Sequence, residues 1–425
     1  MLDIRFIEEN TAAVRQMLAD RNFADKVDLD GLLSAVAGRR KAVSELDDLR
    51  ARRNRASEEV AKLKKSGGDA TKFIEEVRSI SGRIKELEET VREAEEEIEH
   101  INLWLPNMLH SSTPIGKDAS DNVELKRWGK PPTFKFTPRP HWELGAMHGL
   151  LDFERAAKIS GAMFACYFDL GARLERGMIN LMLDMHTAKH GYTEVLAPFL
   201  VNADSMQGTG QLPHLRDDMY KIEDADYFLI PTAEVSVTNL HKDEIIPEAD
   251  LPKCYCSYSA CFRREAGAAG RDTRGLMRMH QFNKVELVKI TGPDNSYEEL
   301  DRLLADAEAV MQALELPYRV ISLCSGDIGF GAAKCYDIEV WLPSEERYRE
   351  ISSCSNYEEF QARRARIRMR RQADNKVVYA HTMNGSGIAL SRAFLALLEV
   401  HQQKDGSIKI PQVLQPYFDG REKIG

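Results

Sequence analysis

Residues 261–286 gather charged and aromatic side chains around a stretch rich in glycine and alanine. The side chains that could do chemistry are Arg263, Arg264, Glu265, Phe282 and Glu286. A guanidinium donates hydrogen bonds in a rigid fork that matches phosphate oxygens, and an aromatic ring offers a face for stacking. The sequence contains neither a Gly-x-x-x-x-Gly-Lys-Ser/Thr loop nor a Gly-x-Gly-x-x-Gly turn after a strand. Any nucleotide bound by this chain must therefore be held by side chains.

Three further stretches carry polar groups that could join the same site. They are Pro-Thr-Ala-Glu at 231–234, Arg-Glu-Ile-Ser-Ser-Cys-Ser-Asn at 349–356 and Asn-Gly-Ser-Gly-Ile-Ala-Leu-Ser-Arg at 384–392. Taken alone, Arg263 and Glu265 fit an exposed cross-strand ion pair, and Glu286 fits an edge carboxylate. Residues 385–387 alone fit a turn. The joint occurrence of these features along one chain favours a common function.

Residues 261–286 resemble motif 2 of class II aminoacyl-tRNA synthetases, in the form seen in the seryl-tRNA synthetase family. This resemblance implies two antiparallel strands joined by a loop. It also implies that Arg263 contacts the ATP α-phosphate, that Glu265 accepts from the adenine amino group, and that Phe282 stacks on adenine. Residues 384–392 resemble motif 3, in which glycines let the backbone approach substrate and Arg392 reaches the γ-phosphate. Ser391 stands where the family usually has glycine.

The same resemblance assigns the other site residues. The serine-binding set is Thr232, Ala233, Glu234, Glu286, Asn384 and Ser386. The ATP-binding set is Arg263, Arg264, Glu265, Phe282, Glu350, Ile351, Ser352, Ser353 and Arg392. Glu350 and Ser353 are expected to hold Mg²⁺. Residues 208–213 and 361–364 also match the family.

The implied reaction has two steps and needs no protein nucleophile. The serine carboxylate attacks the ATP α-phosphate, and the terminal ribose hydroxyl of tRNA then attacks the seryl-adenylate. Arg263, Arg392 and Mg²⁺ would align the reactants and stabilise charge. The expected partners are L-serine and tRNA(Ser), with tRNA(Sec) as a second candidate. Residues 174–198, with Pro198 as the motif proline, resemble motif 1 and imply a homodimer with tRNA bound across its subunits.

Two long helical patterns precede these motifs. Apolar residues in the second pattern recur at spacings of three and four, the a/d seam of a coiled coil; they are Val77, Ile80, Ile84, Leu87, Val91, Ala94, Ile98 and Ile101. The first pattern, 29–65, predicts a helix roughly 55 Å long. Gly67 and Gly68 separate the two, and we therefore expect an antiparallel hairpin.

The charges of the two helices are unevenly shared. Residues 39–65 hold ten Lys/Arg against five Asp/Glu, and residues 72–99 hold five against ten. The two helices could simply pair these charges across the coiled coil. Alternatively, surplus arginines could bind RNA phosphates, and the family resemblance, in which this hairpin binds tRNA, favours that interpretation. The candidate tRNA contacts are Arg39, Arg40, Arg50 and Arg53.

The chain is expected to contain a helical arm at 1–105, a proline-rich linker at 106–141 and a catalytic domain at 142–425. Strands separated by hairpin-like turns, with helices before and after them, predict an α+β fold on an antiparallel sheet. The formal net charge is −9, which does not exclude a local basic stripe. Seven scattered cysteines favour reduced thiols and a cytoplasmic location, and no apolar run is long enough to predict a membrane span.

Two other functions fit part of the sequence. A synthetase-like ligase could charge a carrier protein, although such relatives lack a long arm. A catalytically silent RNA-binding relative could retain the fold, although it would be expected to have lost part of the ATP or serine set.

Overall fold

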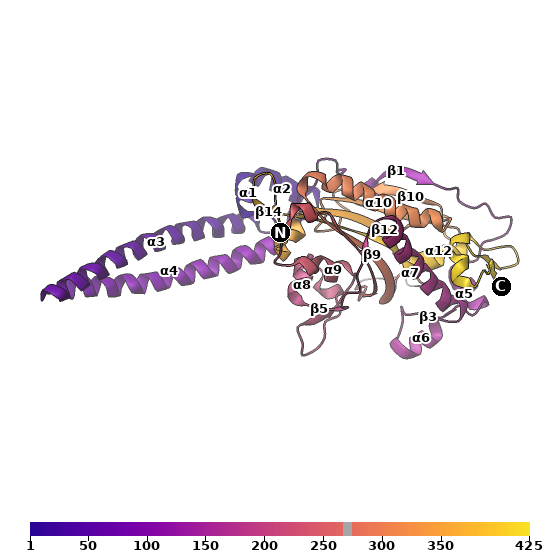
Figure 1. Ribbon diagram of the computed structural model, residues 1–425, viewed down its shortest axis with the longest axis horizontal. Coiled ribbons are helices and arrows are strands. Elements are labelled where there is room, and N and C mark those ends of the chain that lie inside the picture. The colour runs from indigo at the N-terminus through magenta and orange to yellow at the C-terminus, as the bar shows by residue number, and fades with distance from the viewer. Residues whose placement is uncertain (267–273) are drawn as a thin grey trace. The chain divides into compact units, whose positions relative to one another are not determined.

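The computed structural model describes residues 1–266 and 274–425 (Figure 1), and these form two compact units, Met1–Pro106 and Asn107–Gly425. The first unit is entirely helical. Its helices are α1 (Ile4–Glu9), α2 (Thr11–Asp20), α3 (Leu29–Ser66) and α4 (Thr71–Leu103). The expected hairpin is therefore confirmed, with α3 and α4 as its two arms.

Local capping explains where α3 begins and ends. The Asp28 side chain accepts a hydrogen bond from Gly31 N at 2.8 Å, which satisfies one free amide of the first turn. At the other end Gly67 adopts a left-handed conformation with φ 74°, and Gly68 N donates to Leu63 O at 2.9 Å. This is the Schellman arrangement, which glycine adopts without steric cost.

The hairpin seam follows the predicted spacing in α4 and departs from it in α3. Ile80, Ile84 and Leu87 pack against α3 as expected. In α3 the spacing of Leu29, Leu32 and Val36 would continue at Val43, but Val43 is half-buried and the buried contact comes from Ala42 together with Leu46. Arg39 occupies the preceding seam position, and its guanidinium turns to Glu95 at 2.6 Å.

The second unit is built on an eight-stranded sheet. Its strand order is β1 (Val123–Trp128), β10 (Tyr318–Ser322), β11 (Lys334–Leu342), β12 (Arg347–Glu358), β15 (His381–Ala389), β9 (Gln281–Thr291), β8 (Lys253–Phe262) and β4 (Thr193–Glu194). All neighbours are antiparallel except β4 and β8. The expected α+β fold on an antiparallel sheet is confirmed.

Helices cover the sheet and contribute to one large apolar core (Figure 1). They are α5 (His141–Met147), α7 (Leu170–Lys189), α10 (Ser296–Ala313) and α12 (Leu390–Val400). Smaller elements surround the sheet: α6 (Phe153–Ser160), α8 (Ala203–Gly208), α9 (Glu234–Thr238), α11 (Phe360–Ala365), β2 (Leu151–Asp152), β3 (Cys166–Tyr167), β5 (Leu200–Asn202), β6 (Tyr227–Leu229), β7 (Ile245–Pro247), β13 (Arg368–Arg370), β14 (Val377–Tyr379), β16 (Ile408–Lys409) and β17 (Lys423–Ile424). No helix in the described part of the chain combines the length and apolar character needed to cross a bilayer.

Residues 107–141 differ from the irregular linker that their prolines suggest. They belong to the second unit, and β1 pairs with β10 at the edge of the sheet. The strand has no buried face, because all six of its residues are exposed. A bulge at Leu125 interrupts the alternation of side chains in this edge strand. The sequence therefore gives no clear sign of a strand here, and a linker was expected instead.

Candidate functional site

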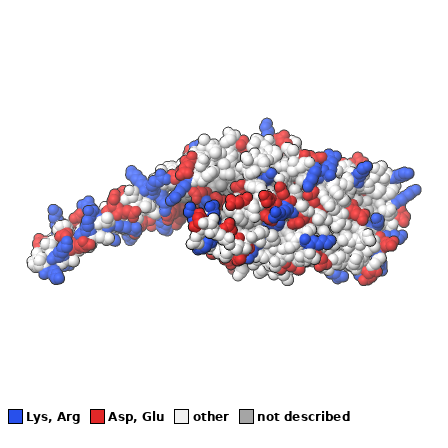
Figure 2. All heavy atoms as spheres, turned by 45° about the horizontal axis from the view of Figure 1, so that its top comes forward, with Lys and Arg blue, Asp and Glu red and all other residues white. Residues whose placement is uncertain are grey.

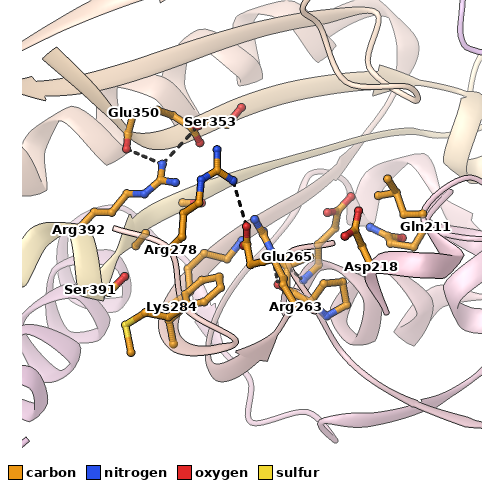
Figure 3. Close-up of a pocket in the computed structure, with 18 of the residues that line it drawn as sticks. Gln211, Asp218, Arg263, Glu265, Arg278, Lys284, Glu350, Ser353, Ser391 and Arg392 are labelled. Atoms are coloured by element: carbon orange, nitrogen blue, oxygen red, sulfur yellow. Dashed lines mark hydrogen bonds and ion pairs between the residues drawn. The ribbon is translucent and has the colours of Figure 1, made fainter. Parts of the chain in front are cut away.

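The candidate site lies over the centre of the eight-stranded sheet. It is a pocket of about 740 Å³, shown in Figure 3. Among the residues that line it are Thr232, Glu234, Arg263, Glu265, Phe282, Glu350, Ile351, Ser353, Asn384, Ser386 and Arg392. Residues predicted from four separate stretches of sequence therefore meet around one cavity.

Strands β8 and β9 position the groups at 263–286. They pair from Lys253–Ile290 to Phe262–Gln281, and Arg263 N continues the pairing by donating to His280 O at 2.9 Å. Phe282 and Lys284 line the pocket because alternate residues of β9 share one face. Val285 and Leu287, on the other face, are buried in the core. Residues 267–273 of this motif lie outside the described residues.

Glu265 pairs with an arginine that sequence reasoning did not select. Arg278 Nη1 lies 3.0 Å from Glu265 Oε2 (Figure 3). Glu265 itself has a left-handed φ of 49°. Arg278 lines the pocket, so the site holds a third arginine beside Arg263 and Arg392.

A bulge in β12 brings the two expected Mg²⁺ ligands to the same face. Ile338 pairs with Ser352 and Glu339 with Glu350, so Ile351 is an extra residue in β12. Without this residue, Glu350 and Ser353 would face opposite sides of the sheet. Arg392 Nη1 lies 3.3 Å from Glu350 Oε2. Although desolvation raises the pKa of Glu350, the cations Arg392 and Arg263 hold it below its ordinary value.

A second bulge, in β15, leads into α12 and Arg392. Ser386 pairs with Glu286 but Ala389 pairs with Lys284, so β15 has one more residue than β9 over this stretch. Ile388 within this bulge has φ 111°, a strained value for a β-branched residue that costs of order 1–3 kcal/mol. After the bulge, Ala389 and Arg392 line the pocket together with Ser386.

The glycines of β15 face away from the pocket, which corrects the expectation that they let the backbone approach substrate. A Cβ on Gly385 would lie 2.2 Å from Leu303 Cδ2 of α10, and one on Gly387 would lie 2.9 Å from His186 Nε2 of α7. These glycines therefore let two helices approach the strand from behind. Residues 385–387 form part of a strand and not a turn.

Two buried carboxylates occupy the expected serine end of the site. Burial raises the pKa of Glu234 to about 7, and the neighbouring Glu286 carboxylate adds to the rise. Gln361 Nε2 donates to Glu234 Oε1 at 2.6 Å and to Thr209 O at 3.2 Å. The matching stretches 208–213 and 361–364 thus meet at Glu234. Glu286 is fully buried, pairs with Lys284 and accepts from Asn384 Nδ2 at 2.8 Å.

Four predicted residues lie outside the pocket lining of the described chain: Ala233, Arg264, Ser352 and Glu286. Arg264 is exposed and its amide donates to Asp218 O at 2.9 Å. Ser352 Oγ donates to Ser386 O at 2.6 Å between adjacent strands. Glu286 does not line the pocket itself but contacts two residues that do, Asn384 and Lys284. Asp218, Gln211 and Lys284 line the pocket but were not among the predicted site residues.

The predicted tRNA contacts lie on α3 in the helical unit. Arg39, Arg40 and Arg50 pair with Glu95, Glu8 and Glu88 at 2.6, 2.6 and 2.8 Å. Arg53 is half-buried. Figure 2 shows basic and acidic groups interspersed along the hairpin, so the charge-pairing interpretation describes part of this surface.

Comparisons with known proteins identify the class and then the family. Residues 220–401 match the model of the tRNA synthetase class II core domain (G, H, P, S and T), and the antiparallel sheet that carries the pocket is the fold of a class II aminoacyl-tRNA synthetase. Residues 1–109 match the seryl-tRNA synthetase N-terminal domain.

Full-length relatives give the family. A serine–tRNA ligase of Caldanaerobacter subterraneus subsp. tengcongensis is 56% identical, with 98% of each chain covered. One of Syntrophobacter fumaroxidans is 52% identical over all of both chains. The structure resembles Pyrococcus horikoshii seryl-tRNA synthetase complexed with ATP, with a TM-score of 0.95, 39% identity and 100% and 99% of the two chains covered. The chain belongs to the seryl-tRNA synthetase family and is a serine–tRNA ligase, which decides against both alternative functions.

Proposed function

We propose that this pocket joins L-serine to ATP as seryl-adenylate and that serine then passes to the 3′ end of tRNA(Ser). The observation that carries the proposal is the meeting of Arg263 and Arg392 with the buried carboxylate Glu234 around one pocket. A second buried carboxylate, Glu286, lies directly behind this lining and binds Asn384. Arginines suit a polyphosphate, and buried carboxylates suit the ammonium and hydroxyl of serine. The ATP complex of the Pyrococcus relative supports the proposal that ATP is one of the two substrates of this pocket.

The residues divide between the two substrates. Arg263 contacts the α-phosphate and Arg392 the γ-phosphate, while Glu265 and Phe282 hold adenine and Arg264 lies at the pocket's edge. Glu234, with Thr232 and Ala233, receives the serine ammonium. Glu286, with Asn384 and Ser386, reads the hydroxyl. The serine carboxylate is the nucleophile, so the protein aligns the reactants and stabilises the developing charge.

Glu350 and Ser353 fit a Mg²⁺ site. Their oxygens share one face of β12 because of the bulge at Ile351, and the Glu350 carboxylate is half-exposed. Mg²⁺ is commonly held by one or two carboxylates together with substrate phosphates. When bound, it would neutralise phosphate charge, while Ile351 and Ser352 fix the strand that carries its ligands.

The helical hairpin, residues 1–105, is proposed to bind tRNA through Arg39, Arg40, Arg50 and Arg53. We further propose a homodimer through residues 174–198 in which tRNA bound at one active site meets the hairpin of the other subunit. Residues 106–141 connect this arm to the catalytic residues at 142–425. Since aminoacyl-tRNA is consumed in translation, a cytoplasmic location is proposed.

Two assays test this function. ATP–pyrophosphate exchange with each amino acid should show activity with serine and little with alanine or threonine. Charging assays should then show transfer to tRNA(Ser), and the same assay with tRNA(Sec) tests the second tRNA. Exchange driven best by another amino acid would refute the assignment of the serine pocket.

A further inference from the structure

A buried histidine lies directly behind the motif 3 strand. His186 of α7 is fully buried, and its Nε2 has no hydrogen-bond partner among the described residues. A Cβ added to Gly387 would lie 2.9 Å from that Nε2 and 3.3 Å from Val285 O. The imidazole therefore occupies the space that any side chain at position 387 would need.

A network of polar side chains holds His186 in this place. Its Nδ1 lies 3.0 Å from Nδ1 of His190, which in turn lies 3.5 Å from Asp306 Oδ1. Tyr192 Oη donates to Asp306 Oδ2 at 2.9 Å, and Lys289 Nζ lies 4.0 Å from the same oxygen. Burial, with His190 nearby, lowers the pKa of His186 to about 3, so the ring is neutral.

The strand segment that His186 touches is the bulge that precedes Arg392. Before the bulge, Asn384 and Ser386 are fixed by register with β9 and by the bond from Asn384 to Glu286. Within it, Ile388 holds a strained φ of 111°. A strained backbone persists only where its surroundings hold it.

We infer that His186 is a positioning residue for ATP: by filling the space behind Gly387 it keeps the β15 bulge in the form that directs Arg392 into the pocket. It acts through the backbone and does not contact substrate. Its removal should therefore affect the ATP side of the site, which follows the bulge, far more than the serine side, which precedes it. This inference rests on the proposed roles of Arg392 and Asn384.

The test compares His186→Ala, Gly387→Ala and the double variant in pyrophosphate exchange. His186→Ala should raise the KM for ATP roughly tenfold to a hundredfold, the scale for a misplacement of about 1 Å, with less than about a threefold change in the KM for serine. Gly387→Ala should lose most activity because its Cβ meets the imidazole. The double variant should recover at least about tenfold over Gly387→Ala, because the space has been vacated.

Matched variants keep the result interpretable. Gly329→Ala adds a Cβ with no atom within 4 Å and should behave like wild type. Gly385→Ala, whose Cβ meets Leu303 instead, should not be rescued by His186→Ala. Thermal unfolding of each variant identifies any that fails to fold, and His186→Ser, which also vacates the space behind Gly387, then replaces His186→Ala. Equal changes in both KM values, or no rescue in the double variant, would overturn the inference. A normal KM for serine in a His186 variant of reduced activity, by contrast, leaves the proposed serine pocket intact.

Discussion

The guanidinium of Arg263 lies over the ring of Phe282, with 5.2 Å between its central carbon and the ring centroid. The Arg263 Nε also donates to Pro231 O at 3.4 Å. The groups proposed to bind phosphate and adenine are thus already side by side at the start of β9. In the proposed reaction this preorganised pair would place a cation where negative charge develops on the α-phosphate.

Replacing Arg263 with alanine should remove about 2.7–4 kcal/mol of transition-state stabilisation, which is a loss of about 10² to 10³ in kcat for exchange. The fold should persist, because the side chain is only half-buried. Arg263→Lys should recover little, since an ammonium cannot donate as a fork. Near-normal exchange in Arg263→Ala would contradict its assignment to the α-phosphate.

Replacing Glu286 with alanine should raise the KM for serine and weaken the preference for serine over alanine. In the wild type the serine hydroxyl adds a hydrogen bond to a buried carboxylate that already binds Lys284 and Asn384. Alanine cannot make this bond, and the variant removes its acceptor. Competition in exchange assays measures the ratio of the two kcat/KM values. An unchanged ratio would mean that another side chain reads the hydroxyl.

The affinity for serine should depend on pH through Glu234. Its pKa is about 7 in the empty pocket because the carboxyl is buried beside Glu286, whereas binding of an ammonium favours the ionised form. Below pH 7 the proton must leave before serine binds well. The dissociation constant, measured by calorimetry, should therefore fall by up to about tenfold per unit as pH rises towards 7, and then level off. Glu234→Gln should bind weakly with no such dependence.

Stability should depend on pH through Glu175. This buried residue accepts from Asn283 Nδ2 at 3.1 Å, and burial raises its pKa from 4.5 to about 7. The folded state therefore holds a proton that the unfolded state loses. Its contribution is full below pH 4.5 and disappears as pH rises through 7. The variant Glu175→Gln should lack this contribution to the pH slope and be more stable than wild type at pH 8, by up to about 3 kcal/mol.

Denaturant unfolding of wild type and Glu175→Gln at pH 5, 6, 7 and 8 isolates this effect, because other titrating groups cancel in the difference. Parallel curves for the two proteins would show that Glu175 is ionised throughout.

Removing residues 51–86 should leave serine activation nearly intact and abolish most tRNA charging. Arg50 Nη2 lies 2.8 Å from Glu88 Oε1, so the cut ends of α3 and α4 are adjacent and a short loop can join them. The affinity for tRNA should fall with salt in wild type and show a shallower slope in the truncated enzyme. Full charging by the truncated enzyme would mean that the hairpin is only a charge-paired coiled coil and does not bind tRNA.

A matched pair of single variants separates the two roles of the arm's charges. Arg50→Ala and Glu88→Ala break the same exposed pair and should each change stability by about 1 kcal/mol or less. Only Arg50→Ala should weaken tRNA binding, and equal effects of the two on affinity would assign Arg50 to the coiled coil alone.

The resemblance to motif 2 predicted that Arg263, Glu265 and Phe282 share one site. In the structure all three line one pocket, with Arg263 and Glu265 directly after β8 and Phe282 on β9. Lys284 was missed because charged residues on strands are common and only the fold shows which face they occupy. Arg278 was missed because it lies before β9 begins, where no periodic pattern places its side chain. The bulge at Ile351 was also unpredictable, since neither of its neighbours is the glycine or proline that usually marks one.

The orientation of Gly385 and Gly387 has a consequence for inhibitor resistance. A compound that fills the pocket touches the face carrying Asn384 and Ser386, whereas any side chain added at either glycine meets Leu303 or His186 on the opposite face. A substitution at these glycines can evade such a compound only by displacing the strand, which also damages the site. Escape by this route requires a second change in α7 or α10, so it is a double-mutation event with correspondingly low frequency.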